Sequence, residues 1–350
     1  MYRDLFTGIG RDIFVIWKEN GFSHATILQK KRITMDIRLG LCCINTEMRN
    51  RKTPIFSSRT VRLATIQKKG IAFVKELALE NLRDTIEILK ECHRIGIHVF
   101  RISSEIFPHA TNPQCCGYDM DFATDLLVEL GDTAKKLGIR LTAHPGQFNV
   151  LGSTNQATVD KTVTELNYQA EMFDKMGMGD DSVMVIHGGG LNGDKGAAKQ
   201  RWVDNFALLS KSTQKRLVLE NCEKCYSVKD CIDISYMICE RYGFHVPVVV
   251  DSHHYDCYNI LHPEDQFTEI DKYLPCVLET WHSREIRPKV HISEQGSGKI
   301  GHHSDYVEVI PEYFFDIGRV YGTGFDIMIE AKMKEKAIFH LMENYPELFP

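Results

Sequence analysis

The sequence contains no apolar run of roughly 18 residues or more, the length that a membrane-spanning helix needs. Its N-terminus also lacks the basic segment, apolar stretch and small-residue cleavage site of a secretory signal peptide. We therefore expect neither membrane association nor secretion. The 11 cysteines are scattered and odd in number, which is typical of reduced thiols in a reducing compartment.

A second Cys-x-x-Cys pair is missing as well. The sequence has one such pair, Cys222 and Cys225, and a structural zinc site built on this motif needs another pair at a suitable spacing. We therefore interpret the two cysteines as ordinary thiols rather than as metal ligands.

Acidic residues are absent from the stretch between Arg49 and Lys69, although the chain as a whole carries a net charge of −5. The negative total argues against nucleic-acid binding, but this stretch could contact a polyanion. It contains Pro54 and two serines and lacks clear periodicity, so it predicts a long basic loop. A solvated surface loop and a DNA-binding loop both fit. The basic residues are Arg49, Arg51, Lys52, Arg59, Arg62, Lys68 and Lys69.

From Ile37 onward, short apolar runs alternate with longer amphipathic stretches such as 79–96 and 121–138, both of which end in glycine. This alternation is typical of parallel strands that are buried on both faces. It predicts a (β/α)₈ TIM barrel over residues 37–350, with residues 1–36 as an N-terminal extension. A doubly wound open sheet is the alternative, but no Gly-x-Gly-x-x-Gly follows the first strand. The apolar runs are 37–43, 97–103, 139–144, 182–187, 216–220, 246–251, 288–293 and 325–330.

Most of these predicted strands carry a side chain that can bind metal at or near the carboxyl end, where the catalytic face of a TIM barrel lies. Any one of them alone is more often a satisfied core residue, but three carboxylates buried together would be costly without cations. The strand residues are His144, His187, Glu220, Asp251, His291 and Glu330. The loops add His253, His254, His302 and His303. These donors exceed what one four-coordinate ion needs and suit two or three divalent ions, which can activate water for attack on a phosphodiester.

Lys289 lies two residues before His291, so both side chains point to the same side of the strand. An ammonium beside metal ions would be repelled by roughly several kcal/mol at low dielectric. Lys289 therefore points away, is neutral, or is chemically modified.

A series of segments resembles, in order, the motifs of the ultraviolet damage endonucleases. The segments are RLGLCCIN, RISSEIFPH, HPGQF, VIHGGG, LEN, DSHH, KVHIS, HHSDY and IEAKMKEKA, within residues 37–335. The resemblance implies a TIM barrel with up to three divalent metals, manganese favoured over zinc, cobalt or magnesium. It also implies hydrolysis of the bond immediately 5′ of UV photoproducts, namely cyclobutane pyrimidine dimers and 6-4 photoproducts, with abasic sites as a further substrate.

Carried over to matching positions, the resemblance assigns the site residues. It implies the metal ligands His144, His187, Glu220, Asp251, His254, His291, His303 and Glu330. The catalytic residues it implies are Glu220, Asp251, Glu330 and Lys289, the last of which can be carboxylated in the family.

The resemblance also assigns a DNA-binding surface. Gln147 and Phe148 match the pair that probes the lesion inside the duplex, and Asn45 matches another lesion-side position. An aromatic face can replace lost base stacking. From the basic stretch we expect Arg59 and Arg62 to contact DNA. Leu41 and Phe148 stand where relatives carry tyrosine, and both lack that hydroxyl.

The expected partner is duplex DNA that contains UV lesions, bound by a monomer in the compartment that holds the genome, cytoplasm or nucleus. Three alternatives stay open on the sequence. They are a sugar isomerase or epimerase of the xylose isomerase type, an abasic-site endonuclease of the endonuclease IV type, and a non-catalytic DNA-binding protein. The first normally needs fewer ligands, and the last needs no metal ligands.

Overall fold

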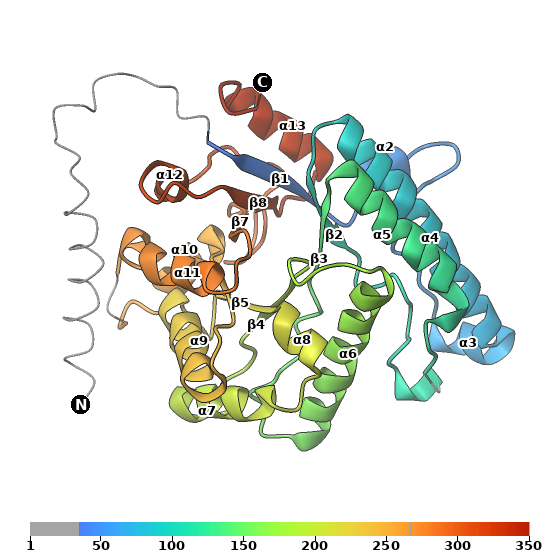
Figure 1. Ribbon diagram of the computed structural model, residues 1–350, viewed down its shortest axis with the longest axis horizontal. Helices are drawn as coiled ribbons and strands as arrows, with labels where there is room; N and C mark the ends of the chain where they lie inside the picture. The colour runs from blue at the N-terminus through green and yellow to red at the C-terminus, as the bar shows by residue number, and fades with distance from the viewer. Residues whose placement is uncertain (1–34, 116, 266–267, 350) are drawn as a thin grey trace. The chain divides into compact units, whose positions relative to one another are not determined.

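Eight parallel strands form a barrel in the computed structural model, which describes residues 35–115, 117–265 and 268–349 (Figure 1). The hydrogen-bonded strand order is β6-β5-β4-β3-β2-β1-β8-β7. Each strand lies within one of the apolar runs, so the predicted TIM barrel is confirmed and the open doubly wound sheet is wrong. The strands are β1 (Ile37–Cys42), β2 (Val99–Ile102), β3 (Arg140–Ala143), β4 (Met184–His187), β5 (Leu217–Glu220), β6 (Val248–Val249), β7 (Lys289–Ile292) and β8 (Phe325–Ile329).

The barrel closes between β6 and β7, the two ends of this strand order. A parallel bridge joins Asp251 to His291, and the backbone N–H of His291 donates to the carbonyl of Val250 at 2.9 Å. The strand β6 is two residues long, so the seam, meaning the contact between β6 and β7, is formed by the residues just beyond β6.

The strands read as continuous apolar runs because both of their faces are covered. All four residues of β3, β5 and β7 are buried, as are all five residues of β8. At Gly40 in β1 an added Cβ would lie 2.9 Å from the Met328 side chain and 3.1 Å from that of Val99. Glycine at this position therefore lets β1 fit between its two neighbours.

Helices cover the outside of the barrel (Figure 1). The predicted helical segment 121–138 corresponds to α5, and Gly138 ends it in the left-handed conformation at φ 65°. The segment 79–96 lies, up to Arg94, in a longer helix, α4 (Ile71–Arg94). The helices are α2 (Thr46–Arg49), α3 (Leu63–Lys69), α4 (Ile71–Arg94), α5 (Thr124–Leu137), α6 (Gln156–Lys175), α7 (Lys195–Phe206), α8 (Lys211–Arg216), α9 (Val228–Tyr242), α10 (Ser252–Leu261), α11 (Leu274–His282), α12 (Glu312–Arg319) and α13 (Glu335–Asn344).

The basic stretch from Arg49 to Lys69 is not a continuous loop, and that prediction is wrong for its last third. Residues Leu63–Lys69 form α3, which ends at Gly70 with φ 79°. Ile66 packs against Val74 of α4 and Cys115. A helix of this length has too few apolar positions to show a helical periodicity in the sequence. Tertiary packing rather than the local pattern stabilises it.

The end of the barrel where the strands begin is held by a buried charge network around Asp326 of β8. Its fully buried carboxylate contacts Arg38 at 2.7 Å, Arg140 at 2.8 Å and Arg287 at 2.8 Å. Burial alone would raise the pKa of Asp326, but the charge of Arg140, aided by Arg38, holds it below its usual value. This end of a TIM barrel serves stability rather than chemistry.

Two predictions concern parts of the chain beyond the barrel. The N-terminal extension, residues 1–36, lies outside the described residues except for its last two positions, so the domain boundary stays a prediction. Among residues 35–115, 117–265 and 268–349, no helix combines the length and the apolar character that a membrane crossing needs.

Candidate metal centre

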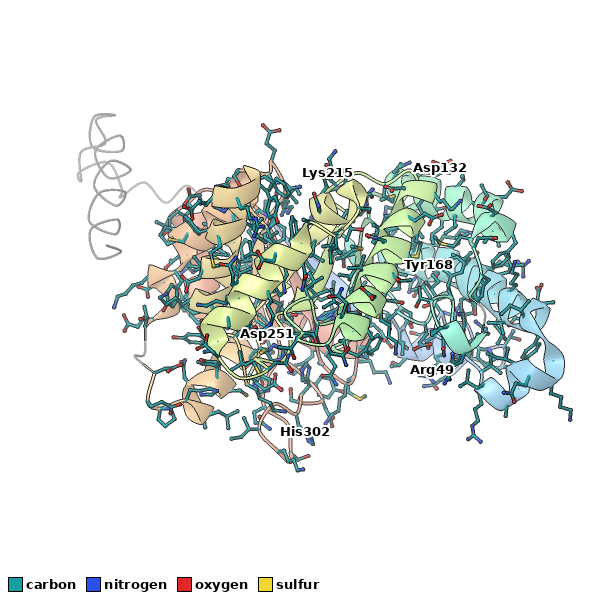
Figure 2. The ribbon with its side chains drawn as sticks, turned by 90° about the horizontal axis from the view of Figure 1, so that it is seen from below. Arg49, Asp132, Tyr168, Lys215, Asp251 and His302 are labelled. Carbon is teal, nitrogen blue, oxygen red and sulfur yellow. The ribbon has the colours of Figure 1, made fainter. Side chains whose placement is uncertain are left out.

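The carboxyl ends of the strands meet at one end of the barrel. Figure 2 shows Asp251 and His302 toward one edge of the molecule and Lys215 and Asp132 toward the opposite edge. Arg49, which begins the basic stretch, lies toward the same edge as Asp251 (Figure 2). The basic stretch therefore begins on the side of the molecule that carries the strand ends.

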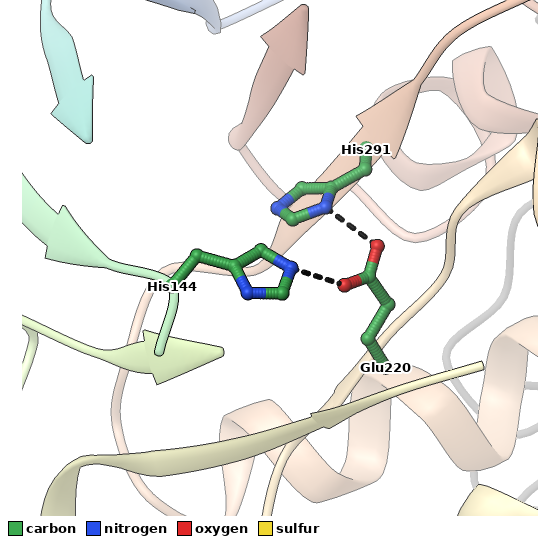
Figure 3. A group of neighbouring side chains, drawn as sticks. All are labelled: His144, Glu220 and His291. Carbon is green, nitrogen blue, oxygen red and sulfur yellow. Dashed lines mark hydrogen bonds and ion pairs between the residues drawn. The ribbon is translucent and has the colours of Figure 1, made fainter. Parts of the chain in front are cut away.

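Glu220, the last residue of β5, is the centre of the histidine and carboxylate cluster (Figure 3). Its side chain is fully buried. His144 donates from Nε2 to Oε2 at 3.0 Å, and His291 donates from Nδ1 to Oε1 at 2.7 Å. The three residues come from the ends of β3, β5 and β7, which are far apart in the sequence. Both carboxylate oxygens therefore face imidazoles, as in a site that can bind a cation.

Three overlapping groups have ligand atoms within 4.8 Å of one another. They are His144, Glu220 and His291, then Glu220, Asp251 and His254, and then Asp251, His291 and Glu330. Each group shares one residue with each of the others, so a single carboxylate could contact more than one ion. Such an arrangement is typical of sites with clustered divalent cations.

The two remaining predicted ligands lie at the margin of these groups. His187 Nε2 is 3.6 Å from Glu220 Oε2, and its ring centroid is 5.2 Å from that of His144. His303 donates from Nδ1 to the carbonyl of Glu330 at 2.6 Å, which leaves its Nε2 free to bind a metal. The structure thus brings all eight predicted ligands together. Their role as ligands stays a prediction.

The resemblance favoured His254 over His253, and the two side chains have different surroundings; the choice stays a prediction. His254 Nδ1 lies 3.8 Å from Glu220 Oε1 and 3.9 Å from Asp251 Oδ1. His253 turns toward its own helix, where its Nδ1 lies 3.6 Å from Cys257 Sγ.

Several buried polar atoms in this cluster have no hydrogen-bond partner. They are Oδ2 of Asp251, Nε2 of His291 and Nδ1 of His187. A buried polar group without a partner costs about 1–3 kcal/mol. A divalent cation ligated by imidazole nitrogens and carboxylate oxygens would satisfy such atoms, so the residues present fit bound divalent metal.

Burial and mutual charge shift the protonation of the cluster. Burial raises the pKa of Asp251 to about 7, opposed by His254 and supported by Glu220 and Glu330. Burial would lower the pKa of His254, but the negative charges of Asp251 and Glu220 raise it to about 9. Burial lowers the pKa of His291 to about 4. Protons on Asp251 and His254 thus partly neutralise the negative charge of the carboxylates. A bound metal would compete with these protons.

Two residues that the sequence reasoning did not assign hold the ligands in place. The Asn221 side chain accepts from the backbone N–H of Asp251 at 2.8 Å and donates to its carbonyl at 3.0 Å, while His254 Nδ1 donates to the Asn221 carbonyl at 3.1 Å. Arg101 forms an ion pair with Glu330. Asn221 lies in the motif LEN and Arg101 in the motif RISSEIFPH. A polar residue in a motif does not by itself indicate what it contacts.

Lys289 lies inside the barrel and is fully buried. Its ammonium lies 3.5 Å from Thr142 Oγ1. Burial lowers its pKa to about 8, and the nearby charge of Arg101 acts in the same direction. The side chain therefore does not reach solvent, and a neutral or chemically modified amine stays a prediction.

The turn after His144 presents an aromatic ring to solvent. Phe148 is 71% exposed, whereas the next residue, Asn149, is buried and hydrogen-bonded to the Gly146 carbonyl. A Cβ at Gly146 would lie 2.4 Å from the Phe148 ring, so glycine at that position lets the ring fold over the turn. Gln147 is also exposed.

A cavity of about 1090 Å³ lies beside this turn. Its lining includes Phe148, Arg62, His109 and Tyr168. Ser103 and Ala143, at the carboxyl ends of β2 and β3, also line it, so the cavity opens beside the strand ends. The exposed ring and a basic side chain therefore share one concave surface.

The other predicted DNA-binding residues have structural contacts. Arg59 forms ion pairs with Glu80 at 3.1 Å and Asp84 at 2.6 Å, and its side chain is 17% exposed. Asn45 is buried and caps α2 by accepting from the Met48 N–H at 2.9 Å. Arg62 is exposed. DNA contact stays a prediction for all three, and the geometry favours it only for Arg62.

The chain was compared with known proteins and structures. The model of the family described as UV-endonuclease UvdE matches residues 37–349. An Acanthamoeba polyphaga mimivirus protein named for UV-damage endonuclease activity is 38% identical over 316 residues, which cover 88% of this chain and 91% of that protein. The UV-damage endonuclease of Schizosaccharomyces pombe is 37% identical, and the match covers 88% of this chain but 50% of that protein. The chain thus spans about half the length of this fungal relative.

Among solved structures, the crystal structure of SacUVDE matches with a TM-score of 0.73 and 30% identity, covering 89% of this chain and 99% of that one. The fold and the cluster define a TIM-barrel enzyme with a metal-type site at the carboxyl ends of its strands. The chain belongs to the UV-endonuclease UvdE family. It is a DNA endonuclease of that family.

Proposed function

We propose that the chain hydrolyses the phosphodiester bond immediately 5′ of UV photoproducts in duplex DNA, both cyclobutane pyrimidine dimers and 6-4 photoproducts, and also nicks abasic sites. The observation that carries this proposal is the set of three overlapping histidine and carboxylate groups beside an exposed aromatic residue, Phe148. Hydrolysis of a phosphodiester has a very high uncatalysed barrier, which such a cluster can lower through bound cations.

Two or three divalent ions, with manganese favoured over zinc, cobalt or magnesium, are proposed as the cofactors. When bound, they would polarise the phosphoryl oxygens and lower the pKa of a water molecule. The proposed ligands are His144, His187, Glu220, Asp251, His254, His291, His303 and Glu330.

The protein's own contribution is to orient these ligands. Glu220 accepts from His144 and His291 and so fixes the tilt of both rings. Asn221 positions Asp251 and His254 through its side chain and carbonyl. Arg101 offsets the charge of Glu330 within the buried site. Lys289, buried close to this charge, acts as a neutral or carboxylated amine.

Lesion recognition is assigned to the turn after His144. Gln147 and Phe148 fill the space that a damaged dinucleotide leaves in the stack, and insertion of this kind kinks the duplex. Arg62 meets a phosphate. Asn45 acts through the position of α2, because its own side chain is buried. Leu41 is fully buried too. The position at which relatives carry a tyrosine hydroxyl is therefore a core position in this chain, not an exposed one. The enzyme is proposed to act as a monomer wherever the cell keeps its genome.

The test is an incision assay on matched duplexes that carry a photoproduct, an abasic site or no lesion. We expect a nick immediately 5′ of the photoproduct that EDTA abolishes and manganese restores. Cleavage of the abasic duplex alone would assign the chain to abasic-site repair. Binding of every duplex without cleavage would indicate a non-catalytic protein, and no interaction with DNA would favour a sugar substrate.

A further inference from the structure

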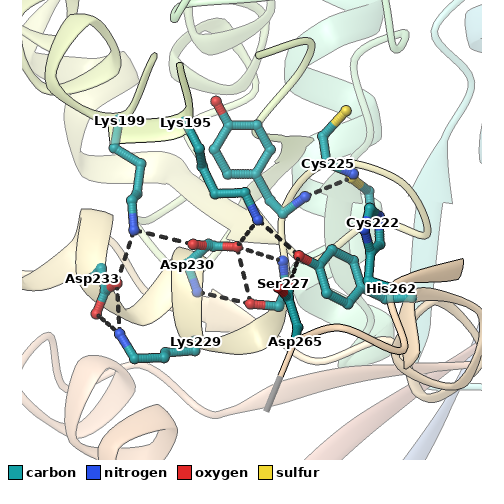
Figure 4. Close-up of polar contacts among 12 residues, drawn as sticks. Lys195, Lys199, Cys222, Cys225, Ser227, Lys229, Asp230, Asp233, His262 and Asp265 are labelled. Atoms are coloured by element: carbon teal, nitrogen blue, oxygen red, sulfur yellow. Dashed lines mark hydrogen bonds and ion pairs between the residues drawn. The ribbon is translucent and has the colours of Figure 1, made fainter. Parts of the chain in front are cut away.

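The Cys222–Cys225 pair occupies the loop that follows Glu220, between β5 and α9 (Figure 4). Cys222 Sγ accepts from the backbone N–H groups of Cys225 and Tyr226, each at 3.3 Å. The loop therefore folds back on itself and places the backbone of Cys225 beside the Cys222 sulfur, and a disulfide needs two cysteines that lie close together.

The surroundings hold this turn in place. The backbone N–H of Cys222 donates to the Tyr226 carbonyl at 2.9 Å, and Tyr226 is fully buried. Ser227 and Asp230 then form the capping box that begins α9. Lys195 from α7 donates to Asp230 at 3.0 Å (Figure 4). A helix start and an ion pair thus fix the loop on one side, and β5 fixes it on the other.

The two thiols differ in exposure and in chemistry. Cys222 is 8% exposed, whereas Cys225 is partly exposed. The hydrogen bond from Cys222 lowers the pKa of Cys225 to about 6, despite its burial, and the N–H of Leu191 and the charge of Lys195 assist. Burial instead raises the pKa of Cys92 to about 12. An accessible thiolate beside a second thiol is the arrangement found in reactive Cys-x-x-Cys pairs.

We propose that Cys222 and Cys225 form a reversible disulfide site that exchanges with small-molecule disulfides such as glutathione disulfide. Neither residue belongs to the metal-type groups found among the described residues, and the pair lies in the loop just after the proposed ligand Glu220. The proposal replaces the interpretation of the two cysteines as ordinary thiols.

The exchange proceeds in two balanced steps. The Cys225 thiolate attacks one sulfur of glutathione disulfide, whose sulfur–sulfur bond breaks, and one glutathione leaves. Cys222 then loses its proton and attacks Cys225 Sγ, which expels the second glutathione. The protein gives up two electrons and its thiol protons, and one glutathione disulfide becomes two glutathione thiols.

The experiment equilibrates the metal-loaded full-length chain in buffers of rising glutathione disulfide content, then quenches with acid, alkylates free thiols and maps non-reduced peptides. We expect one two-electron transition and a cross-linked peptide that joins Cys222 to Cys225. Cys225→Ser should abolish the transition. Cys222→Ser should instead trap glutathione on Cys225. Cys239→Ser, which removes a partly exposed thiol outside the pair, should leave the transition unchanged.

Three outcomes would overturn the proposal. One is full alkylation of both thiols at the most oxidising ratio. Another is a stable glutathione adduct on Cys225 in the parent protein, which would show that Cys222 cannot reach it. The third is thiols that react only after EDTA treatment, which would make the pair a metal ligand. The peptide map of the parent protein decides among these results even if a variant fails to fold, and none depends on DNA cleavage.

Discussion

Replacing Phe148 by alanine should separate lesion recognition from the hydrolytic step. The ring is 71% exposed, so its removal takes little apolar surface out of the core, and the protein should fold and bind metal as before. The buried neighbour Asn149 keeps its hydrogen bonds to Gly146, which preserves the turn. What the variant loses is the aromatic face available to unstacked bases.

The size of the loss follows from base stacking, which is worth about 1–3 kcal/mol per base. Since each 1.4 kcal/mol is a factor of ten, affinity for a photoproduct duplex should fall by roughly 5- to 150-fold. Binding to undamaged duplex should change little, because no ring is inserted there. Discrimination between the two duplexes should therefore fall by the same factor.

The assay measures affinity and single-turnover incision on damaged and undamaged duplexes of the same sequence. Val320→Ala is the matched control, because Val320 is 55% exposed and follows α12, near the start of β8 at the opposite end of the barrel. The reasoning is refuted if Phe148→Ala discriminates between the duplexes as well as the parent protein does. Phe148 would then serve only to cover the Pro-Gly turn.

Four further variants test other parts of the molecule. Glu220→Gln should lower the bound metal measured by elemental analysis and abolish incision, and a full metal complement with normal cleavage would contradict the site assignment. Arg62→Gln should make the slope of log affinity against log salt shallower by about one unit. Arg59→Gln should leave that slope unchanged and lower the melting temperature, because the Arg59 guanidinium forms ion pairs with carboxylates of α4. Equal salt slopes for the two variants would contradict the assignment of DNA contact to Arg62 and of a structural role to Arg59. Asp326→Asn should cost on the order of 3 kcal/mol of unfolding free energy at neutral pH. Because the folded pKa of Asp326 is lowered, its contribution is present above the unfolded value of about 3.9 and is lost as pH falls through the folded value, so denaturant titrations of parent and variant should converge in acid.

The barrel could be predicted from the sequence because its strands are buried on both faces and so appear as continuous apolar runs. The convergence of the strand-end residues followed from topology alone, since all parallel strands deliver their carboxyl ends to one face. For this reason His144, Glu220 and His291 could be grouped although they lie far apart in the sequence.

The sequence could not predict contacts that leave no periodic pattern of apolar residues. The short helix α3 is stabilised by packing rather than by its own pattern. Arg59 belongs to a basic stretch, and only the position of α4 reveals that carboxylates there pair with it. Asn45 is likewise a helix cap, and the supporting role of Asn221 depends on a hydrogen bond between the ends of the neighbouring strands β5 and β6, to Asp251. The cap at Asn45 is local, but the other contacts depend on which elements lie side by side.

The seam between β6 and β7 links the assembly of the fold to cation binding. The bridge that closes the barrel joins Asp251 to His291, and both are proposed ligands. An open barrel would separate them, so cations would bind the closed form and favour it by mass action. Folding and metallation would then share one equilibrium, with the free-metal concentration setting how often the seam opens. Bound metal would in this way stabilise the closed barrel as well as serve as its cofactor.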